Sequence, residues 1–206
     1  MKKLLVFAAM MVSLAFAKSE PFTHDGFYFS ITSGLGYGSI NQDVGNGLAT
    51  IESKGVQAET SFKIGAAIVH GLIIHATFAM NQLYSDLVAT SKYGDEESLS
   101  HDGFNIFLFG GGATFYIPGN TNIFLSASAG ASDYSISLGN KSADYLNLDP
   151  GFGFTAMIGK EWWIHEELGL GIAFSYTHTS AEGTYRRQHN DASTNMFTLS
   201  ASFTFN

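Results

Sequence analysis

The sequence predicts an all-β fold, an eight-stranded antiparallel up-and-down transmembrane β-barrel. Large apolar residues alternate with small or polar residues in eight separate segments, which is the period of a β-strand with one apolar face. The connections between these segments are alternately long and short. The chain has 206 residues, 23 Gly, 18 Phe, no Cys and only 14% charged residues, so no disulfide framework holds it together.

The clearest pair of strands lies between residues 151 and 177. One face of this pair carries its large apolar side chains: Phe152, Phe154, Ala156, Ile158, Leu168, Leu170, Ile172, Phe174 and Tyr176. The opposite face carries mainly Gly, Ala, Ser and Thr. A crowded barrel interior accommodates small residues, whereas a lipid-facing exterior accommodates large apolar ones, with aromatic residues at the water boundary. The pattern therefore predicts a membrane hairpin, with Trp162 and Trp163 at its turn.

The other strands follow the same alternation. We expect strands over residues 26–38, 56–69, 72–81, 103–117, 123–131, 151–159, 168–177 and 197–205. The fourth strand is ambiguous because Phe104, Ile106 and Leu108 compete with Phe107 and Phe109 for the outer face. A bulge at the three glycines 110–112 would switch its register.

Four long connections are expected as surface loops, over residues 39–55, 82–102, 136–149 and 179–192. A membrane barrel places short turns in the periplasm and long loops outside, and an even number of strands returns both termini to the periplasm. The second loop is acidic. Asp95, Glu96 and Glu97 offer carboxylates to Ca²⁺ but lack the spacing of a calcium loop, so a solvated surface is favoured.

The first 17 residues have the features of a signal peptide. Lys2 and Lys3 precede an apolar core, and Ala15-Phe16-Ala17 matches the cleavage pattern, so we expect cleavage before Lys18 and a barrel domain over residues 18–206. The mature chain then carries 8 basic and 18 acidic residues, a net charge of 8 − 18 = −10. This balance argues against a nucleic-acid partner.

Two groups of site residues are expected. A polar network in the lumen comprises Gln57, Glu59, Lys63 and His75. A salt bridge between Glu59 and Lys63 that gates the lumen is one interpretation, but a network that satisfies buried polar groups is favoured. Aromatic residues at the membrane interfaces are Tyr37, Tyr84, Tyr176, Trp162, Trp163, Phe203 and Phe205. The histidines are scattered without metal-ligand spacing, and neither a metal nor a cofactor is expected.

The alternating strands, the Gly159-Lys-Glu-Trp-Trp163 turn and the aromatic last strand resemble the small eight-stranded outer-membrane barrels of the OmpA, OmpW and opacity types. The resemblance implies a place in the cell outer membrane, among its lipid and lipopolysaccharide, and insertion by the barrel-assembly machinery. That machinery reads a C-terminal strand that usually ends in Phe, whereas here Phe205 precedes Asn206.

The first functional hypothesis is a non-enzymatic structural or surface-interaction role through the four long loops, whose partner the sequence does not name. The alternative is OmpW-like passage of small hydrophobic molecules, which requires an apolar inward-facing lining that Phe107 and Phe109 would supply. A third hypothesis is a lipid A deacylase, because His178-Thr179-Ser180 resembles the His-x-Ser of that family. Ala181 departs from the family's pattern, and Thr194 or Asn195 stands where its acid would fall.

Overall fold

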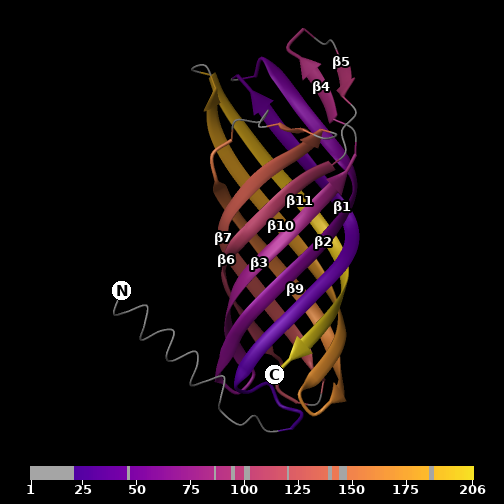
Figure 1. Cartoon of the computed structure of the whole chain (residues 1–206), viewed down its shortest axis with the longest axis vertical. Helices are drawn as coiled ribbons and strands as arrows, with labels where there is room; N and C mark the ends of the chain where they lie inside the picture. Colours follow the sequence, from indigo (N-terminus) through magenta and orange to yellow (C-terminus); the bar gives the residue numbers. More distant parts are fainter. Residues whose placement is uncertain are drawn as a thin grey trace, which may run out of the picture.

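The computed structural model is a tall barrel of tilted strands (Figure 1). It describes residues 21–45, 47–85, 87–93, 96–99, 103–119, 121–138, 141–143, 148–185 and 188–206, so the predicted signal peptide lies outside the described residues. The strands are β1 (Phe27–Val44), β2 (Ala49–Val69), β3 (Leu72–Tyr84), β4 (Leu87–Ser91), β5 (Glu96–Leu99), β6 (Gly103–Tyr116), β7 (Ile123–Leu138), β8 (Lys141–Ala143), β9 (Gly151–His165), β10 (Leu168–Tyr185) and β11 (Gln188–Phe205). Within these ranges, no helix is long and apolar enough to cross a bilayer.

Eight of these strands form a closed antiparallel ring, in the order β1, β11, β10, β9, β7, β6, β3 and β2, with β2 pairing back to β1. One row of cross-strand neighbours leads from Tyr37 around the barrel to Phe27 on the same strand, an offset of 37 − 27 = 10 residues. Ten residues span about 33 Å along a strand, and eight strands span about 38 Å around the barrel. The ratio of these two lengths is the tangent of the tilt, so the strands tilt by about 41° from the barrel axis. The predicted eight-stranded barrel is confirmed.

The alternation of faces is also as predicted. Large apolar side chains such as Leu35, Ile64 and Leu199 are exposed on the outside, while Ser30, Thr177 and their equivalents are buried inside. In a soluble protein an exterior of this kind would be in contact with water. Here it forms the apolar belt that a bilayer covers.

Strand β6 is regular, and the bulge considered at its three glycines does not occur. Its pairing with β3 and β7 runs without a register shift. Phe104, Ile106 and Leu108 are buried inside, whereas Phe109 is 68% exposed, and Phe107 stacks on the outward-facing Phe78. The inward placement of Phe107 and Phe109 was therefore wrong. Residues 110–112 carry no side chains, so their sequence contains no signal for either face.

Most of the predicted loops are in fact strand. β1 and β2 pair from Phe27 with Ala66 up to Val44 with Ala49, and β10 and β11 pair up to Tyr185 with Gln188. Strands β4 and β5 occupy much of the second predicted loop, and β8 part of the third. β4 and β5 lie above the ring at the top of Figure 1. Above the membrane the outward side chains meet water, so the apolar alternation that marks a strand disappears.

Candidate functional site

The lumen is the candidate site, and side chains fill it at three levels. An apolar cluster lies at the end with the long connections, a polar belt lies in the middle, and an aromatic cluster lies at the end with the short turns. An eight-stranded barrel has an interior about as wide as its side chains, so filling is the expected state.

The polar belt is organised around Glu59, which is 2% exposed. Its Oε2 atom accepts hydrogen bonds from Thr198 Oγ1 at 2.7 Å and from Ser175 Oγ at 3.1 Å. Gln57 donates through Nε2 to the same Thr198 hydroxyl. These bonds join β2 to β10 and β11 across the lumen, so they fix the width of the barrel at this level.

Lys63 lies lower in the belt and donates to Ser126 Oγ at 2.8 Å, with Met157 Sδ at 3.6 Å. Among the described residues, no ion pair within 4.0 Å joins Lys63 to Glu59. Each charge is held by hydroxyl groups instead, which is the arrangement of a network that satisfies buried polar groups. A gating salt bridge between the two is not formed.

His75 completes this belt. Its Nε2 lies 3.0 Å from Thr114 Oγ1, and its Nδ1 lies 3.0 Å from Thr77 Oγ1. Gly112, its partner on the neighbouring strand β6, gives the imidazole its space, because a Cβ there would lie 2.8 Å from His75 Cε1 and 2.2 Å from the Ala127 carbonyl oxygen. The four residues predicted for the lumen thus all lie inside it, in two hydrogen-bonded groups of the belt: Gln57 with Glu59, and Lys63 with His75 through Ser126 and Thr114.

The upper level is apolar, which the sequence did not indicate. Its buried members come from six strands: Ile40, Leu83, Phe104, Ile106, Tyr134, Ala181 and Met196. Tyr134 OH lies 2.6 Å from Thr179 Oγ1, so its polar end is satisfied. An apolar inward lining therefore exists, supplied by the face of β6 opposite to the one expected.

The lower level combines aromatic and acidic groups. Tyr28, Ile73, Tyr116, Phe124, Met157 and Ala173 form its apolar part. Glu161 accepts from Tyr116 OH at 2.9 Å and from Thr204 Oγ1 at 2.6 Å. Two carboxylates, Glu59 and Glu161, are therefore buried in the lumen, each held by hydroxyl donors.

A segment outside the strands covers this lower end. We call residues Pro21 to Gly26 the N-terminal strap. Its central residue, His24, is 7% exposed and stacks on Tyr116, with ring centroids 3.3 Å apart, and on Trp163, with centroids 4.8 Å apart. Burial lowers the pKa of His24 from 6.5 to about 4. A pocket of about 500 Å³ lies beside the strap, between Phe22, His70, Asn122 and Trp163.

The predicted interface aromatics divide between the two faces. Tyr37, Tyr84, Trp162 and Phe203 are exposed on the outside, and Tyr176 and Phe205 are half-buried. Trp163 shares the inward face of β9 with Glu161 and packs against the strap. The period of two along a strand explains this division, because adjacent tryptophans cannot share a face.

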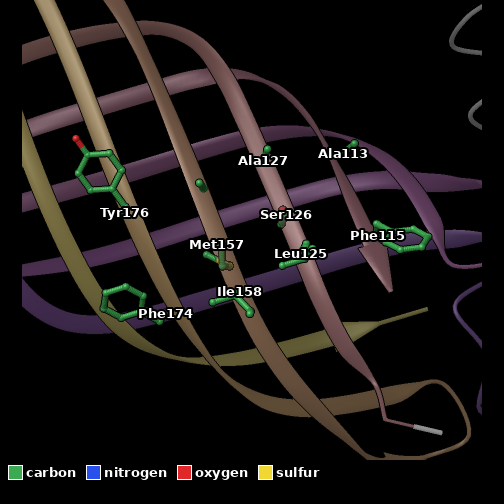
Figure 2. Close-up of a pocket in the computed structure, with 10 residues that line it drawn as sticks. Ala113, Phe115, Leu125, Ser126, Ala127, Met157, Ile158, Phe174 and Tyr176 are labelled. Carbon is green, nitrogen blue, oxygen red and sulfur yellow. The ribbon is translucent and has the colours of Figure 1, made fainter. Parts of the chain in front are cut away.

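A shallow groove of about 380 Å³ runs over the outer wall rather than through the lumen. Figure 2 shows its lining on neighbouring strands, with Ala113, Ala127, Leu125 and Ile158 between Phe115 and Tyr176. Both small and large apolar side chains line it, and they come from the outer face of the barrel. It therefore belongs to the lipid-facing surface.

No protein-family model and no curated protein matches the sequence. Among solved structures, Neisserial surface protein A aligns with a TM-score of 0.51 and 14% identity over 87% of this chain and 96% of that chain. The outer membrane protein OprG from Pseudomonas aeruginosa aligns with a TM-score of 0.51 and 12% identity, over 89% and 98%. The chain has the fold of the small outer-membrane β-barrels.

Among the described residues of this barrel there is one group of possible metal ligands that the sequence did not reveal. Glu182, His189 and Asp191 place their ligand atoms within 4.8 Å of one another at the outer end of β10 and β11. His189 Nε2 lies 3.0 Å from Asp191 Oδ1. All three side chains are exposed, which is equally the geometry of a surface ion pair. The sequence signal for this group is the register of the β10–β11 hairpin, which pairs Glu182 with Asp191 and so brings their carboxylates together.

The residues of the deacylase hypothesis lie on the outer face of the barrel. His178 and Ser180 share the outward side of β10, and His178 Nδ1 lies 3.0 Å from Asn195 Oδ1. Tyr176 OH donates to the same oxygen at 2.7 Å. A neutral amide thus occupies the place from which an acid would orient the histidine. The outer membrane protease OmpT from Escherichia coli aligns with a TM-score of 0.49 and 8% identity, which is too low to carry an argument about enzymatic activity.

Proposed function

We propose that the protein is a non-enzymatic anchor in the outer membrane that presents an extracellular β-platform to partners outside the cell. We define the platform as the upper ends of the β1–β2 and β10–β11 hairpins. Strand length carries this proposal. β2 has 21 residues, and β1, β10 and β11 have 18 each, whereas about 9–11 tilted residues cross a bilayer.

The excess length gives the platform its height. About seven to nine residues of β1, β10 and β11, and about ten to twelve of β2, exceed the length that crosses the bilayer. At a tilt of about 41° each residue rises about 2.5 Å, so about seven to nine residues raise the platform about 17–23 Å above the bilayer. Both hairpins stay paired over this distance. A paired sheet holds its side chains in fixed positions, which a mobile loop of the same length does not.

Charge indicates the class of partner. The four connecting regions, residues 43–54, 85–102, 133–149 and 180–191, contain 12 acidic and 5 basic residues, a net charge of 12 negative less 5 positive, or −7. Six of these seven net charges lie in residues 85–102 and 133–149, which are connections at the same end as the platform, and one lies on the platform itself. A partner surface that is positively charged would be attracted to this end of the barrel, and salt would weaken the attraction.

The test neutralises the acidic residues of the platform and leaves the barrel. An Asp43→Asn, Glu52→Gln, Glu182→Gln, Asp191→Asn variant removes four negative charges without shortening either hairpin. Proteoliposomes holding the full chain should be retained on a poly-lysine surface more strongly than those holding this variant, and not on poly-glutamate. Equal retention of both would contradict the proposal. Deleting residues 182–191 and joining β10 to β11 with a two-residue turn keeps the register below, because Glu182 pairs with Asp191. This deletion removes two acidic and two basic residues, so it separates the effect of shape from that of charge.

A second function, passage of small hydrophobic molecules, is favoured by two observations. The upper lumen is lined by apolar side chains. The ladder between β7 and β9 ends at Ser132 and Gly151, although β7 continues to Leu138 and pairs with the short strand β8 from Ile136. A solute that entered from outside would therefore meet an apolar lining beside a part of the wall where β7 no longer pairs with β9.

Uptake of a fluorescent apolar solute into liposomes tests this second function. If passage occurs, a Phe104→Ala, Ile106→Ala variant should alter the rate, whereas a Phe107→Ala, Phe109→Ala variant on the outer face should not. No entry into liposomes that hold the folded chain would reject passage. A non-enzymatic anchor does not hydrolyse lipid A. Ser180→Ala should therefore leave the lipid A of expressing cells unchanged.

A further inference from the structure

We propose that the N-terminal strap is an acid-released closure of the periplasmic mouth, and that His24 is the group whose protonation releases it. This inference concerns regulation at the end opposite to the platform, so it stands independently of the proposed function.

The strap is held to the barrel at both ends and in its middle. Phe22 N–H donates to the Glu166 carbonyl at 2.8 Å, Gly71 N–H donates to the His24 carbonyl at 3.3 Å, and Ala67 N–H donates to the Gly26 carbonyl at 2.8 Å. These bonds connect it to the turn after β9 and to the turn between β2 and β3. The strap therefore crosses the mouth from one side of the ring to the other.

His24 is the side chain that closes the contact. Its ring lies nearly parallel to Tyr116, at 11°, and at 28° to Trp163, while Phe22 meets Trp163 edge-on at 6.2 Å. Both ring nitrogens are buried and neither makes a well-formed hydrogen bond, although the amides of Asn122 and Asn206 lie close enough to affect the pKa of the ring. A neutral imidazole tolerates this site, whereas an imidazolium would lose the water that stabilises its charge.

The groups that face His24 do not compensate for a charge. Burial is the largest influence on its pKa and lowers it; the side chains of Asn206 and Asn122 raise it, His70 lowers it, and Asp25 raises it. Asp25 is already engaged, because its Oδ1 lies 3.1 Å from His70 Nδ1. Glu161, beneath Tyr116, accepts the hydrogen bonds of Tyr116 and Thr204. Glu166 and Glu167 also lie at this mouth. The Glu166 carbonyl accepts from Phe22 N–H, and the Glu167 carbonyl accepts from Asn206 N–H.

The size of the pH effect on strap release follows from the difference between the pKa of His24 in the released strap and in the bound strap. A released His24 binds a proton with the ordinary pKa of 6.5, and the bound residue does so near 4. Protons therefore favour the released strap at every pH below 6.5. The ratio of released to bound strap should rise about 20-fold from pH 7 to pH 5 and about 120-fold from pH 7 to pH 4.

Amide hydrogen exchange of the refolded chain in detergent micelles measures this ratio even when little strap is released. The amides of Phe22 and Gly71 report release, because both hydrogen bonds break with it. The amide of Ile117 is the control at the same end, since it donates to the Ile123 carbonyl within the barrel. Protection factors are corrected for intrinsic exchange at each pH.

We expect protection of Phe22 and Gly71 to fall about 100-fold from pH 7 to pH 4 while Ile117 stays unchanged. His24→Phe keeps a flat ring that takes no proton, and His24→Gln is a smaller neutral side chain; either variant, once shown to be folded by heat-modifiable migration, should lose the pH dependence. Unchanged protection of Phe22 and Gly71 in the natural chain would overturn the proposal, as would the same fall in both variants.

Discussion

Replacing Lys63 with methionine should destabilise the barrel by about 3–4 kcal/mol. Lys63 is the single Lys or Arg among the buried side chains of the described chain, and it lies in the lumen with two carboxylates, Glu59 and Glu161. Glu59 and Lys63 are four residues apart on β2, or about 13 Å, which gives about 1.3 kcal/mol at an effective dielectric constant of about 20. The charged hydrogen bond to Ser126 contributes about 1.5–3 kcal/mol more.

A double-mutant cycle isolates the charge contribution. Glu59→Gln retains an oxygen that accepts from Thr198 and Ser175 but removes one negative charge, so it should offset about 1.3 kcal/mol of the Lys63→Met effect. The assay is urea unfolding in phospholipid vesicles, followed by tryptophan emission. Lys54→Met, at an exposed lysine paired with Glu52, is the control and should cost no more than about 1 kcal/mol. Additive effects of the two lumen changes, or a neutral Lys63→Met, would refute this reasoning.

Three further predictions test other levels of the barrel. The ring protons of His24, followed by NMR, should titrate near pH 4 instead of 6.5; because the unfolded chain takes up the proton first, stability is complete above pH 6.5 and falls by about 3 kcal/mol as the pH drops from 6.5 to 4. Brominated lipids should quench Trp162, which faces outward, more than Trp163, which stacks on His24; variants that keep one tryptophan each show whether the order is reversed. Leu108→Ala should cost about 2–5 kcal/mol because it leaves a cavity in a packed lumen, while Phe109→Ala, 68% exposed to lipid, should cost less than about 1 kcal/mol; equal losses would contradict the register of β6.

The membrane part of the fold could be predicted from the sequence because lipid imposes a strict rule on one face of every strand. Segments such as 168–177 place Leu170, Ile172 and Phe174 outward without exception, and the structure agrees. Where water replaces lipid, the rule ends. In the upper parts of β1 and β11, polar residues such as Asn41 and Ser193 face outward, and the pattern no longer distinguishes a strand from a loop.

The side chains of the lumen were harder to predict, because both small polar and large apolar residues can fill the interior of a barrel. Gln57, Glu59, Lys63 and His75 were found because alternation assigns a face to polar residues in a clear strand. The upper apolar cluster was missed because β6 has apolar residues on both faces, so its sequence does not say which face is inside. The position of His24 could not be predicted, because the N-terminal strap that holds it has no alternating pattern.

Single-channel recording tests the central claim of a filled lumen most directly. The refolded mature chain, inserted into planar bilayers at neutral pH, should remain electrically silent, because side chains of the upper cluster, the polar belt and the lower cluster occupy the interior from end to end. Folding and insertion are verified by heat-modifiable migration of the same sample. Steady, ohmic openings of the folded chain would contradict a filled lumen and would require a continuous aqueous path through the barrel.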